Sequence, residues 1–329
     1  MSVLVEGKCG IKAEIILHSV ASSGAEIITY VIDVPRMVWS EVMTHRMFSR
    51  NAASSRAIPF AAMQEQLTAR PVRFGEANAG MQDKGEDFSG HVTLSHGNGY
   101  NSGAIVSPEY AWLAARDSAM RFSRAFKESG YHKQVYNRLT EPFQMIRAII
   151  TATSFDNFFW LRCDGAADPT IEELANCMYK AKQQSVPQQL KEGEWHLPYI
   201  EVKRCVATGE QAFFTDEEAI DIEDAKKVCA ARCAAVSFRK DGLYGLEKSK
   251  EVWKRLVGDE RKHASALEHA ARAMSVKQWW DDPICWEEGI THMDRNGDYW
   301  SGNFRGFIQL RQLLDNHTCY DYEKAKNNH

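Results

Sequence analysis

Two consecutive β-rich runs near the start of the chain constrain its fold most strongly. Between Glu14 and Val34 the sequence reads IILHSV and then IITYVIDV, and Ser22-Ser23-Gly24 separates the two runs. β-Branched and aromatic residues on both sides of a small, polar turn predict a strand–turn–strand unit. We therefore expect a β-sheet in the N-terminal part of the molecule.

Helical patterns follow the two strands. Ser107-Pro108 starts a pattern that Gly130 ends, and Asp168-Pro169 starts another that ends at Val186-Pro187. Ser and Asp side chains accept hydrogen bonds from the first free N–H groups of a helix, and Pro fits its first turn. The segment 75–103 is rich in Gly, Asn, Asp and His and is predicted as a long surface loop. Further helical segments are predicted over residues 35–47, 139–160, 216–238, 248–257, 261–274 and 304–314. These elements predict an α+β fold, with a central mixed or antiparallel sheet flanked by long helices.

Composition excludes several classes of protein. Charged residues make up 26% of the 329 residues and the formal net charge is only -4, so a strongly basic nucleic-acid binder is not expected. No apolar stretch approaches the ~18 residues that a membrane span requires. Residues 1–12 lack a basic region followed by an apolar block, so we expect no signal peptide and a cytoplasmic protein.

The eight cysteines are scattered and suggest neither a metal site nor a disulfide framework. No pair has the Cys-x-x-Cys spacing, and the close pair Cys229 and Cys233 has no neighbouring His or Cys at a ligand spacing. We expect reduced and mostly buried thiols, and no bound metal.

The most unusual segment is Thr44–Arg56, which reads THRMFSRNAASSR. It contains three arginines, one histidine and three serines but no acidic residue, although the whole chain is acidic. Guanidinium groups form bidentate bonds with phosphate, and hydroxyl side chains and backbone N–H groups complete its shell. The small residues Ala52–Ser55 let a ligand approach the backbone closely. The segment is therefore a candidate phosphate site, with a solvated, charged helix face as the alternative.

The same segment resembles the signature of the flavin-dependent thymidylate synthases. In that signature His-Arg is followed after seven residues by Ser and, two residues later, by Arg. His45-Arg46, Ser54 and Arg56 fit this spacing. The sequence departs from the signature at Thr44 and Ala52, where the family has Arg and Glu.

Two further motifs resemble the same family in the same order. The segment 132–142 (HKQVYNRLTEP) is similar to a family segment that places Arg138 at a nucleotide-binding position. The segment 156–162 (DNFFWLR) is similar to the family's Asn-Phe-x-x-Leu-Arg segment. At 167–171 the sequence Ala-Asp-Pro-Thr-Ile stands where the family has Ala-Gln-x-Glu-Ile. The resemblance thus covers residues 44–171 and implies the α+β fold of that family.

The family's first block has a counterpart only late in this chain. Residues 230–238 (AARCAAVSF) resemble its Ala-Ala-Arg-Val-Ser-Tyr block, and 263–269 (HASALEH) resemble its His-x-Ser-Pro-Phe-Glu-His block. We interpret this order as a partial duplication or a circular permutation, with a chance match of ordinary helix sequence as the alternative. The interpretation divides the chain into a thymidylate-synthase-like nucleotide- and flavin-binding core (1–205) and a C-terminal helical part (206–329) packed on it.

The resemblance implies the reductive C5 methylation of dUMP to dTMP, with FAD as cofactor and with NADPH and 5,10-methylenetetrahydrofolate as co-substrates. It also implies a homotetramer whose active sites combine residues of several subunits. The substrate-binding residues that it implies are Glu41, Ser54, Ser55, Arg56, Arg138 and Arg162. The cofactor-binding residues that it implies are His45, Arg46, Asn157, His263, Ser265 and Glu268.

Arg162 is the candidate catalytic residue. C5 of uracil becomes nucleophilic when negative charge accumulates on the ring oxygens and N3, and a guanidinium group stabilises that charge without a proton transfer. The apolar run Phe158–Leu161 lowers the local dielectric and strengthens the effect. A structural ion pair, for example with Asp164, is the alternative role.

Three alternatives stay open at this point. Glu41 stands where the family often has a Gln that reads the pyrimidine, so a methylase or hydroxymethylase of another nucleotide such as dCMP is one alternative. A non-catalytic nucleotide- or flavin-binding homologue is another. Finally, a second polar and basic cluster either replaces the guanidinium lost at Thr44 or is an exposed helix face. This cluster consists of Asn303, Arg305, Gln309 and Arg311.

Overall fold

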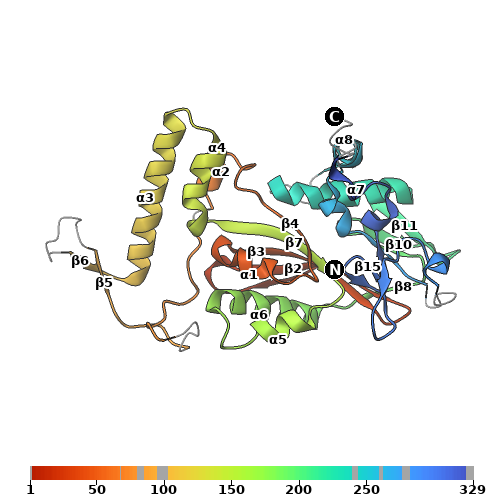
Figure 1. Ribbon diagram of the computed structural model, residues 1–329, viewed down its shortest axis with the longest axis horizontal. Coiled ribbons are helices and arrows are strands. Elements are labelled where there is room, and N and C mark those ends of the chain that lie inside the picture. Colours follow the sequence, from red (N-terminus) through yellow and green to blue (C-terminus); the bar gives the residue numbers. More distant parts are fainter. Residues whose placement is uncertain are drawn as a thin grey trace.

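A computed structural model of the chain describes residues 2–66, 68–79, 85–94, 103–238, 244–258, 262–275 and 282–323. Figure 1 shows how its helices and strands are arranged. The α-helices are α1 (Trp39–Met43), α2 (Phe60–Gln64), α3 (Pro108–Glu128), α4 (Lys133–Tyr136), α5 (Asp156–Arg162), α6 (Pro169–Gln184), α7 (Ile222–Ala235) and α8 (Leu246–Val257). The 3₁₀ helices are η1 (Lys8–Gly10), η2 (Arg36–Val38), η3 (Asn137–Phe143), η4 (Val236–Phe238), η5 (Ala264–Glu268), η6 (Pro283–Cys285) and η7 (Leu310–Leu313).

The central sheet has the strand order β1-β2-β3-β7-β4, with β8 paired to β2. The pairing of β8 with β2 is parallel and the other pairs are antiparallel, so the sheet is mixed as predicted. Its strands are β1 (Val3–Glu6), β2 (Lys12–Ala21), β3 (Glu26–Pro35), β4 (Ser49–Ala52), β7 (Met145–Ala152) and β8 (Gln188–Leu190). The predicted strand–turn–strand unit is β2 and β3.

Four smaller sheets complete the described part of the chain. Their members are β10 (Glu201–Arg204), β11 (Gln211–Thr215) and β12 (Glu218–Ile220); β9 (Trp195–His196), β13 (Ala271–Ala273) and β17 (Phe307–Gln309); β14 (His292–Met293), β15 (Tyr299–Ser301) and β16 (Phe304–Arg305); and β5 (Val92–Leu94) and β6 (Ala104–Val106).

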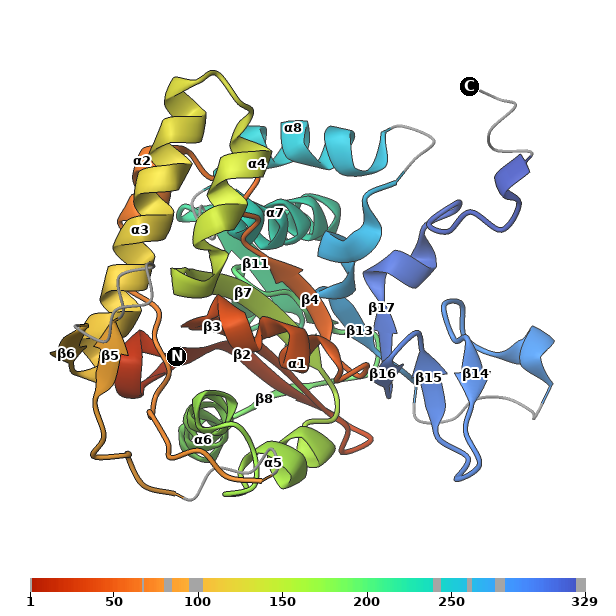
Figure 2. The ribbon, with the colours of Figure 1, turned by 60° about the vertical axis from the view of Figure 1, so that its left-hand side comes forward.

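Helices cover both faces of the central sheet, as Figures 1 and 2 show. Side chains alternate between the two faces of a strand. On β3, Ile28, Tyr30 and Ile32 belong to the hydrophobic core that contains α6, whereas Val31 belongs to the core that contains α7. The expectation of flanking helices is confirmed for α6 and α7. The 21-residue α3 instead packs against η3 and α4.

The predicted helix starts of α3 and α6 are confirmed. Ser107 Oγ accepts a hydrogen bond from Tyr110 N at 3.2 Å. Asp168 Oδ1 accepts from Thr170 N at 2.7 Å and from Ile171 N at 3.3 Å. No helix within the described ranges is both long and apolar enough to cross a membrane.

Three predicted helices are wrong in whole or in part. The segment 139–160 contains strand β7, the segment 261–274 contains η5 and β13, and the segment 304–314 contains β16, β17 and η7. Seven of the eight residues of β7 are buried, so its sequence lacks the alternation that marks a half-buried strand. The strands β13 and β17 pair with each other, and β13 also pairs with β9 from residues 195–196. Such pairing between distant segments leaves no local sequence pattern.

Other predicted boundaries are also corrected. Helix α1 ends at Met43 rather than residue 47, and α7 begins at Ile222 after β12, rather than at 216. The predicted loop 75–103 includes strand β5, and parts of it (80–84 and 95–102) lie outside the described residues.

A line of buried hydrogen bonds joins the central sheet to the C-terminal segments. His196 Nδ1 lies 2.8 Å from Ser19 Oγ, and His196 Nε2 lies 2.9 Å from Thr29 Oγ1. Thr29 Oγ1 lies 2.8 Å from Thr151 Oγ1, which lies 2.9 Å from His269 Nδ1. All five residues are fully buried. We call them the buried polar line.

The division of the chain into parts 1–205 and 206–329 stays a prediction.

Candidate functional site

The basic segment 44–56 forms the connection from α1 through β4 to the following loop. Arg50 is a structural residue, because its Nη1 donates to the carbonyl oxygens of Met43 at 2.9 Å and His45 at 3.1 Å, just after α1 ends. Arg46 and Arg56 are exposed and have no hydrogen bond or ion pair to any residue that the structure describes. Two of the three arginines are thus free to meet an anion.

Glu41, His45 and Arg162 form one cluster at the start of this segment. Arg162 Nη1 donates to Glu41 Oε2 at 3.0 Å, and Arg162 Nε donates to His45 Nε2 at 3.2 Å. The ion-pair partner of Arg162 is therefore Glu41 and not Asp164. The ring of His45 packs edge-on against Phe158, with centroids 4.9 Å apart. Glu41 on α1 and His45 just after α1 thus hold the guanidinium group that α5 carries.

The surroundings of the cluster set its protonation. Burial, followed by the positive charges of Arg162 and Arg50, lowers the pKa of His45 to about 4. The ring is neutral at pH 7, which suits an Nε2 that accepts a hydrogen bond. Burial raises the pKa of Glu41, and the Arg162 charge opposes that shift.

Ser54, Ser55, Arg56 and Arg138 form a second group beyond the other end of β4. Asn137 is fully buried, and its Nδ2 donates to the carbonyl oxygens of Ser55 at 2.8 Å and Ile58 at 3.1 Å. Ser55 Oγ donates to Glu141 Oε1 at 2.6 Å. These bonds hold the 54–58 loop against η3, which carries Arg138.

Arg138 is exposed like Arg56 and also has no partner among the residues described. No hydrogen bond or ion pair within the described ranges joins this second group to the Arg162 cluster. Asn157 lies on α5 with Arg162, where it is exposed and unpartnered within those ranges. Within one chain, the predicted substrate residues therefore lie in two separate groups.

The two C-terminal blocks that resemble the family both lie against β4. Ser54 N donates to Ser237 O at 3.2 Å, and η4 packs against β4 and β7. The 3₁₀ helix η5 also packs on β4. In this block Glu268 pairs with Arg311, whereas His263 and Ser265 are exposed. The fold thus brings residues 230–238 and 263–269 beside the basic segment from far along the chain.

The polar cluster at 303–311 is not an exposed helix face. Asn303 Nδ2 donates to Met47 O at 2.9 Å, and Gln309 is buried with its Nε2 3.2 Å from Ser49 Oγ. Asn303 lies just before β16, and Gln309 lies at the end of β17. These two members of the cluster therefore contact the basic segment directly, whereas Arg305 and Arg311 bond to other residues.

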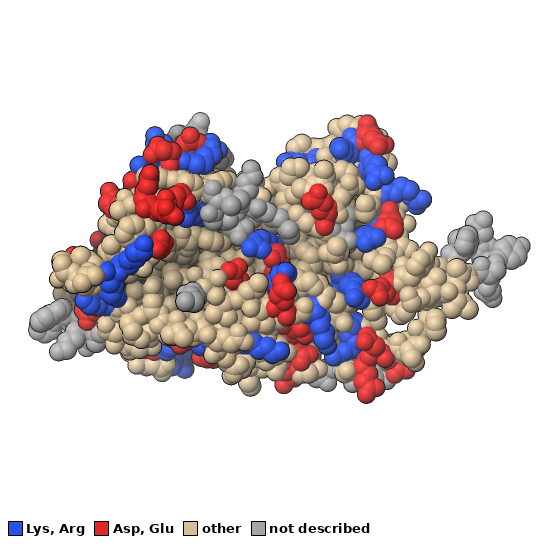
Figure 3. Space-filling model, turned by 180° about the vertical axis from the view of Figure 1, so that it is seen from behind, with Lys and Arg blue, Asp and Glu red and all other residues tan. Residues whose placement is uncertain are grey.

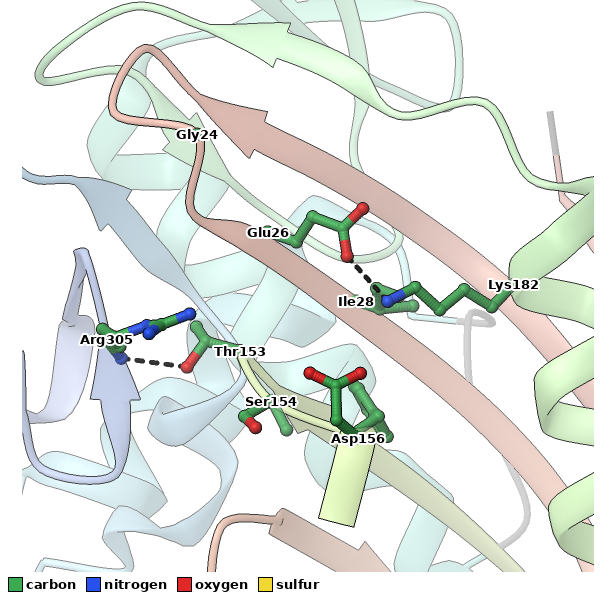
Figure 4. Close-up of a pocket in the computed structure, with 10 residues that line it drawn as sticks. Gly24, Glu26, Ile28, Thr153, Ser154, Asp156, Lys182 and Arg305 are labelled. Atoms are coloured by element: carbon green, nitrogen blue, oxygen red, sulfur yellow. Dashed lines mark hydrogen bonds and ion pairs between the residues drawn. The ribbon is translucent and has the colours of Figure 1, made fainter. Parts of the chain in front are cut away.

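A cavity of about 130 Å³ opens where β3, β7, α5, α6 and β16 meet (Figure 4). Charged residues of both signs border it: Glu26, Asp156, Lys182 and Arg305. The hydroxyl-bearing residues Thr153 and Ser154 also line it, and Arg305 N donates to Thr153 Oγ1 at 2.9 Å. The sequence analysis missed Asp156 and Lys182, although Asp156 opens the motif that contains Asn157 and Arg162.

None of the eight cysteines, all of which lie within the described ranges, forms a disulfide, but the prediction that they are mostly buried is wrong. Cys177, Cys229 and Cys233 are buried in helices, whereas Cys205, Cys285 and Cys319 lie in exposed turns and ends of elements. Among the residues described, no group of three or more His, Cys, Asp or Glu could hold a metal ion.

Comparison with known proteins gives weak matches. The sequence matches no protein-family model and no curated protein. One similar solved structure is the flavin dependent thymidylate synthase ThyX from Helicobacter pylori complexed with FAD and dUMP, with a TM-score of 0.30 and 17% identity over 47% of this chain and 67% of that chain. A second structure of Thymidylate Synthase X from the same organism, also with FAD and dUMP, gives a TM-score of 0.31 and 15% identity over the same shares. Similarity at this level establishes neither the family nor the activity of the chain.

Proposed function

We propose that the chain is a FAD-dependent methylase that converts dUMP to dTMP, with 5,10-methylenetetrahydrofolate as one-carbon donor and NADPH as reductant. The proposal rests on the family resemblance of residues 44–171 and on the arrangement of their side chains. In this proposal Ser54, Ser55, Arg56 and Arg138 hold the nucleotide.

The arrangement of Arg56 and Arg138 carries the proposal. Both guanidinium groups are exposed and without partners in the described part of the chain, although Asn137, next to Arg138, holds the carbonyl oxygen of Ser55, next to Arg56. An ion pair at an exposed guanidinium group usually contributes little to stability, so the fold loses little by leaving these two groups unpaired. Unpaired guanidinium groups beside a serine-rich loop can both donate to a phosphate group. The face in Figure 3 shows acidic and basic side chains intermingled.

Exposed side chains, and not the described cavity, are the candidates for binding FAD. Arg46 and Asn157 are exposed and free to bind a pyrophosphate or a ring amide. The cavity of about 130 Å³ is much smaller than the ~300–1,000 Å³ of ordinary ligand pockets. We therefore propose that a second copy of the chain covers the cofactor, in a homotetramer with shared sites. When bound, the flavin supplies the redox and one-carbon transfer chemistry.

Arg162 stabilises negative charge on the pyrimidine ring in this proposal. Glu41 and His45 fix its direction before the substrate arrives, which is the preorganisation that makes electrostatic stabilisation effective. Neutral His45 leaves the cluster with one positive charge from Arg162 and one negative charge from Glu41.

The C-terminal block completes the site in this proposal. Glu268, His263 and Ser265 belong to a segment whose helix η5 packs on β4 beside the basic segment. We propose that His263 and Ser265, which are exposed, contact the flavin and that Glu268 positions them.

The Glu41 carboxylate favours a second candidate function, the C5 methylation or hydroxymethylation of dCMP. A carboxylate accepts from the N4 amino group of cytosine, and a neighbouring guanidinium donates to its N3. One oxygen of Glu41 is bonded to Arg162, and the side chain is partly exposed. Glu41 and Arg162 together therefore match the cytosine edge as well as the uracil edge.

Spectroscopic titration tests the proposal. Purified protein is expected to be yellow or to take up FAD, and dUMP or dCMP is expected to perturb the flavin absorbance. The double variant Arg56→Gln/Arg138→Gln is expected to weaken nucleotide binding by at least about tenfold, because each charge-assisted bond contributes about 1.5–3 kcal/mol. Arg255→Gln, an exposed arginine on α8, is the matched control. Protein that neither takes up FAD nor binds either nucleotide would contradict the proposal.

A further inference from the structure

The cavity in Figure 4 contains one acidic group that the fold leaves unpaired. Glu26 is held by Lys182 Nζ at 2.8 Å and by His18 Nε2 at 3.5 Å. Asp156, in contrast, has no hydrogen bond or ion pair to any residue of the described ranges. A carboxylate with both oxygens free at a cavity wall is an acceptor for N–H donors.

Arg305 does not neutralise Asp156, because its own charge is already paired. Arg305 Nη1 lies 3.2 Å from Asp298 Oδ2, on the β14–β16 sheet. The Arg305 backbone N–H is bonded to Thr153. The cavity thus presents Asp156 as its open acceptor, with Lys182 Nζ and the Ser154 hydroxyl as neighbouring donors.

The remaining walls of the cavity belong to the central sheet and to the residue before α5. Ile28 and Ala152 are directly paired across β3 and β7, and they line the cavity together with Phe155. The volume of about 130 Å³ admits one small ring system and excludes a dinucleotide. Ile28, Ala152 and Phe155 are each no more than 3% exposed, so the lining that an occupant can touch is mostly polar and favours a small ring with hydrogen-bonding groups along its edge.

We propose that this cavity binds a 2-amino-4-oxopyrimidine ring, the edge that a pterin and a guanine share. The ring N–H and the exocyclic amino group are parallel donors, and they pair with the two oxygens of Asp156 as a guanidinium does. The 4-oxo group accepts from Lys182 Nζ, which has three donors and uses one on Glu26. The pterin case rests on the proposed function, since it places the folate on α5, the helix that also carries Arg162.

Calorimetric titration of the full chain without added FAD or nucleotide substrate tests this inference. The probes are 5-formyltetrahydrofolate, which carries the pterin edge; GMP, which carries the guanine edge; and IMP, which lacks the 2-amino group. We expect 5-formyltetrahydrofolate or GMP to bind at least about tenfold more tightly than IMP, because one bond to a carboxylate is lost. Tighter binding of 5-formyltetrahydrofolate identifies a folate site, and tighter binding of GMP identifies a guanine nucleotide site.

The variant Asp156→Asn tests the assigned acceptor. Its amide group turns an N–H toward the ring donors, so binding of the preferred probe is expected to weaken about 10- to 100-fold. Asp117→Asn on α3, which lines no part of the cavity, is the matched control and is expected to bind as the wild type does. Thermal melting of both variants separates lost binding from lost folding.

Two results would overturn the inference: equal affinity for GMP and IMP with no binding of the folate probe, or binding that Asp156→Asn leaves unchanged. If Asp156→Asn does not fold, the wild type still decides, because an affinity for IMP that neither 5-formyltetrahydrofolate nor GMP exceeds contradicts the inference. These titrations do not involve turnover. If the protein methylates dUMP but these titrations fail, the proposed function stands and the proposed cavity site is refuted. If the titrations succeed but the protein binds no flavin, the cavity site stands and the proposed function is refuted.

Discussion

The guanidinium group of Arg162 has its direction fixed by two residues from the 41–45 segment. Glu41 accepts from Nη1 and His45 accepts from Nε, while Phe158 holds the His45 ring. A charged group that is held in place before the ligand arrives loses little entropy on binding and needs little reorganisation. The cluster therefore has the fixed geometry that its proposed role requires.

Replacement of Arg162 tests this role at the residue scale. Arg162→Ala is expected to abolish turnover while FAD stays bound, because the charge on the pyrimidine ring loses its stabilising partner. Arg162→Lys keeps the charge but cannot bond Glu41 and His45 as a planar fork, so kcat is expected to fall about 10²- to 10³-fold. Steady-state kinetics and flavin absorbance measure both effects, and unchanged turnover in Arg162→Ala would refute the role.

Asn137→Ala tests the loop that holds the phosphate residues. The substitution leaves the carbonyl oxygens of Ser55 and Ile58 without their buried donor, so we expect the free energy of unfolding to fall by about 1–3 kcal/mol. Nucleotide binding is expected to weaken as well, because Ser54–Arg56 loses its fixed position relative to Arg138.

Chemical denaturation measures the stability change in Asn137→Ala. Asn157→Ala is the control for stability alone, because Asn157 is exposed and has no partner in the described part of the chain. Equal losses of stability in the two variants would show that the Asn137 bonds do not hold the loop.

The candidate site was predictable from the sequence only in part. The lack of acidic residues in 44–56 marked the basic segment, and spacing marked Arg138 and Arg162. The partner of Arg162 was not predictable, because Glu41 lies 121 residues away and reaches it only in the folded chain. Arg50 was not distinguishable from Arg46 and Arg56, because its bonds go to backbone carbonyls that carry no sequence signal.

At the scale of elements, helix ends were predicted best, because they depend on local chemistry. Ser107 and Asp168 begin α3 and α6 as their sequence patterns indicate, through hydrogen bonds to residues two or three positions away. Strand β7 was mistaken for part of a helix, since a short apolar run that is buried on both faces has no period that separates the two structures. Strand β17 depends on pairing with β13, in which Ala271 is paired with Gln309 and Ala273 with Phe307, so it was not predictable locally.

Asp168→Ala tests the start of α6. It removes the acceptor for two backbone N–H groups, so we expect a loss of about 0.5–2 kcal/mol in the free energy of unfolding. Asp164→Ala is the matched control, because Asp164 is exposed and accepts from a single N–H outside a helix. Denaturation curves compare the two variants. A loss in Asp168→Ala that does not exceed the loss in Asp164→Ala would contradict the assigned cap.

At the scale of the whole molecule, the buried polar line connects the sheet to the C-terminal segments. Ser19, Thr29 and Thr151 lie on β2, β3 and β7, whereas His196 lies on β9 and His269 follows η5. Burial lowers the pKa of both histidines to about 3. The folded state is therefore stable only with His196 and His269 in their neutral forms.

Acid is expected to destabilise the fold through these histidines. The unperturbed pKa of histidine is about 6.5, so between about pH 6.5 and 3 the unfolded chain binds protons that the folded chain does not. This stabilising contribution is complete above about pH 6.5 and decreases as the pH falls, by up to about 1.4 kcal/mol per pH unit for each histidine. Denaturation between pH 7 and 5 measures the slope, and His269→Gln is expected to reduce it. A flat profile in the wild type would contradict the account.

The mass of the nucleotide product tests the central claim, that the basic segment with Arg138 and Arg162 serves C5 chemistry on a pyrimidine nucleotide. Protein loaded with FAD is incubated with NADPH and 5,10-methylenetetrahydrofolate, with dUMP in one reaction and dCMP in another. The account predicts that one nucleotide gains the mass of a methyl or hydroxymethyl group, with dUMP expected to become dTMP, and that Arg162→Ala forms no product. Unaltered dUMP and dCMP in both reactions of the flavin-loaded wild type would contradict it.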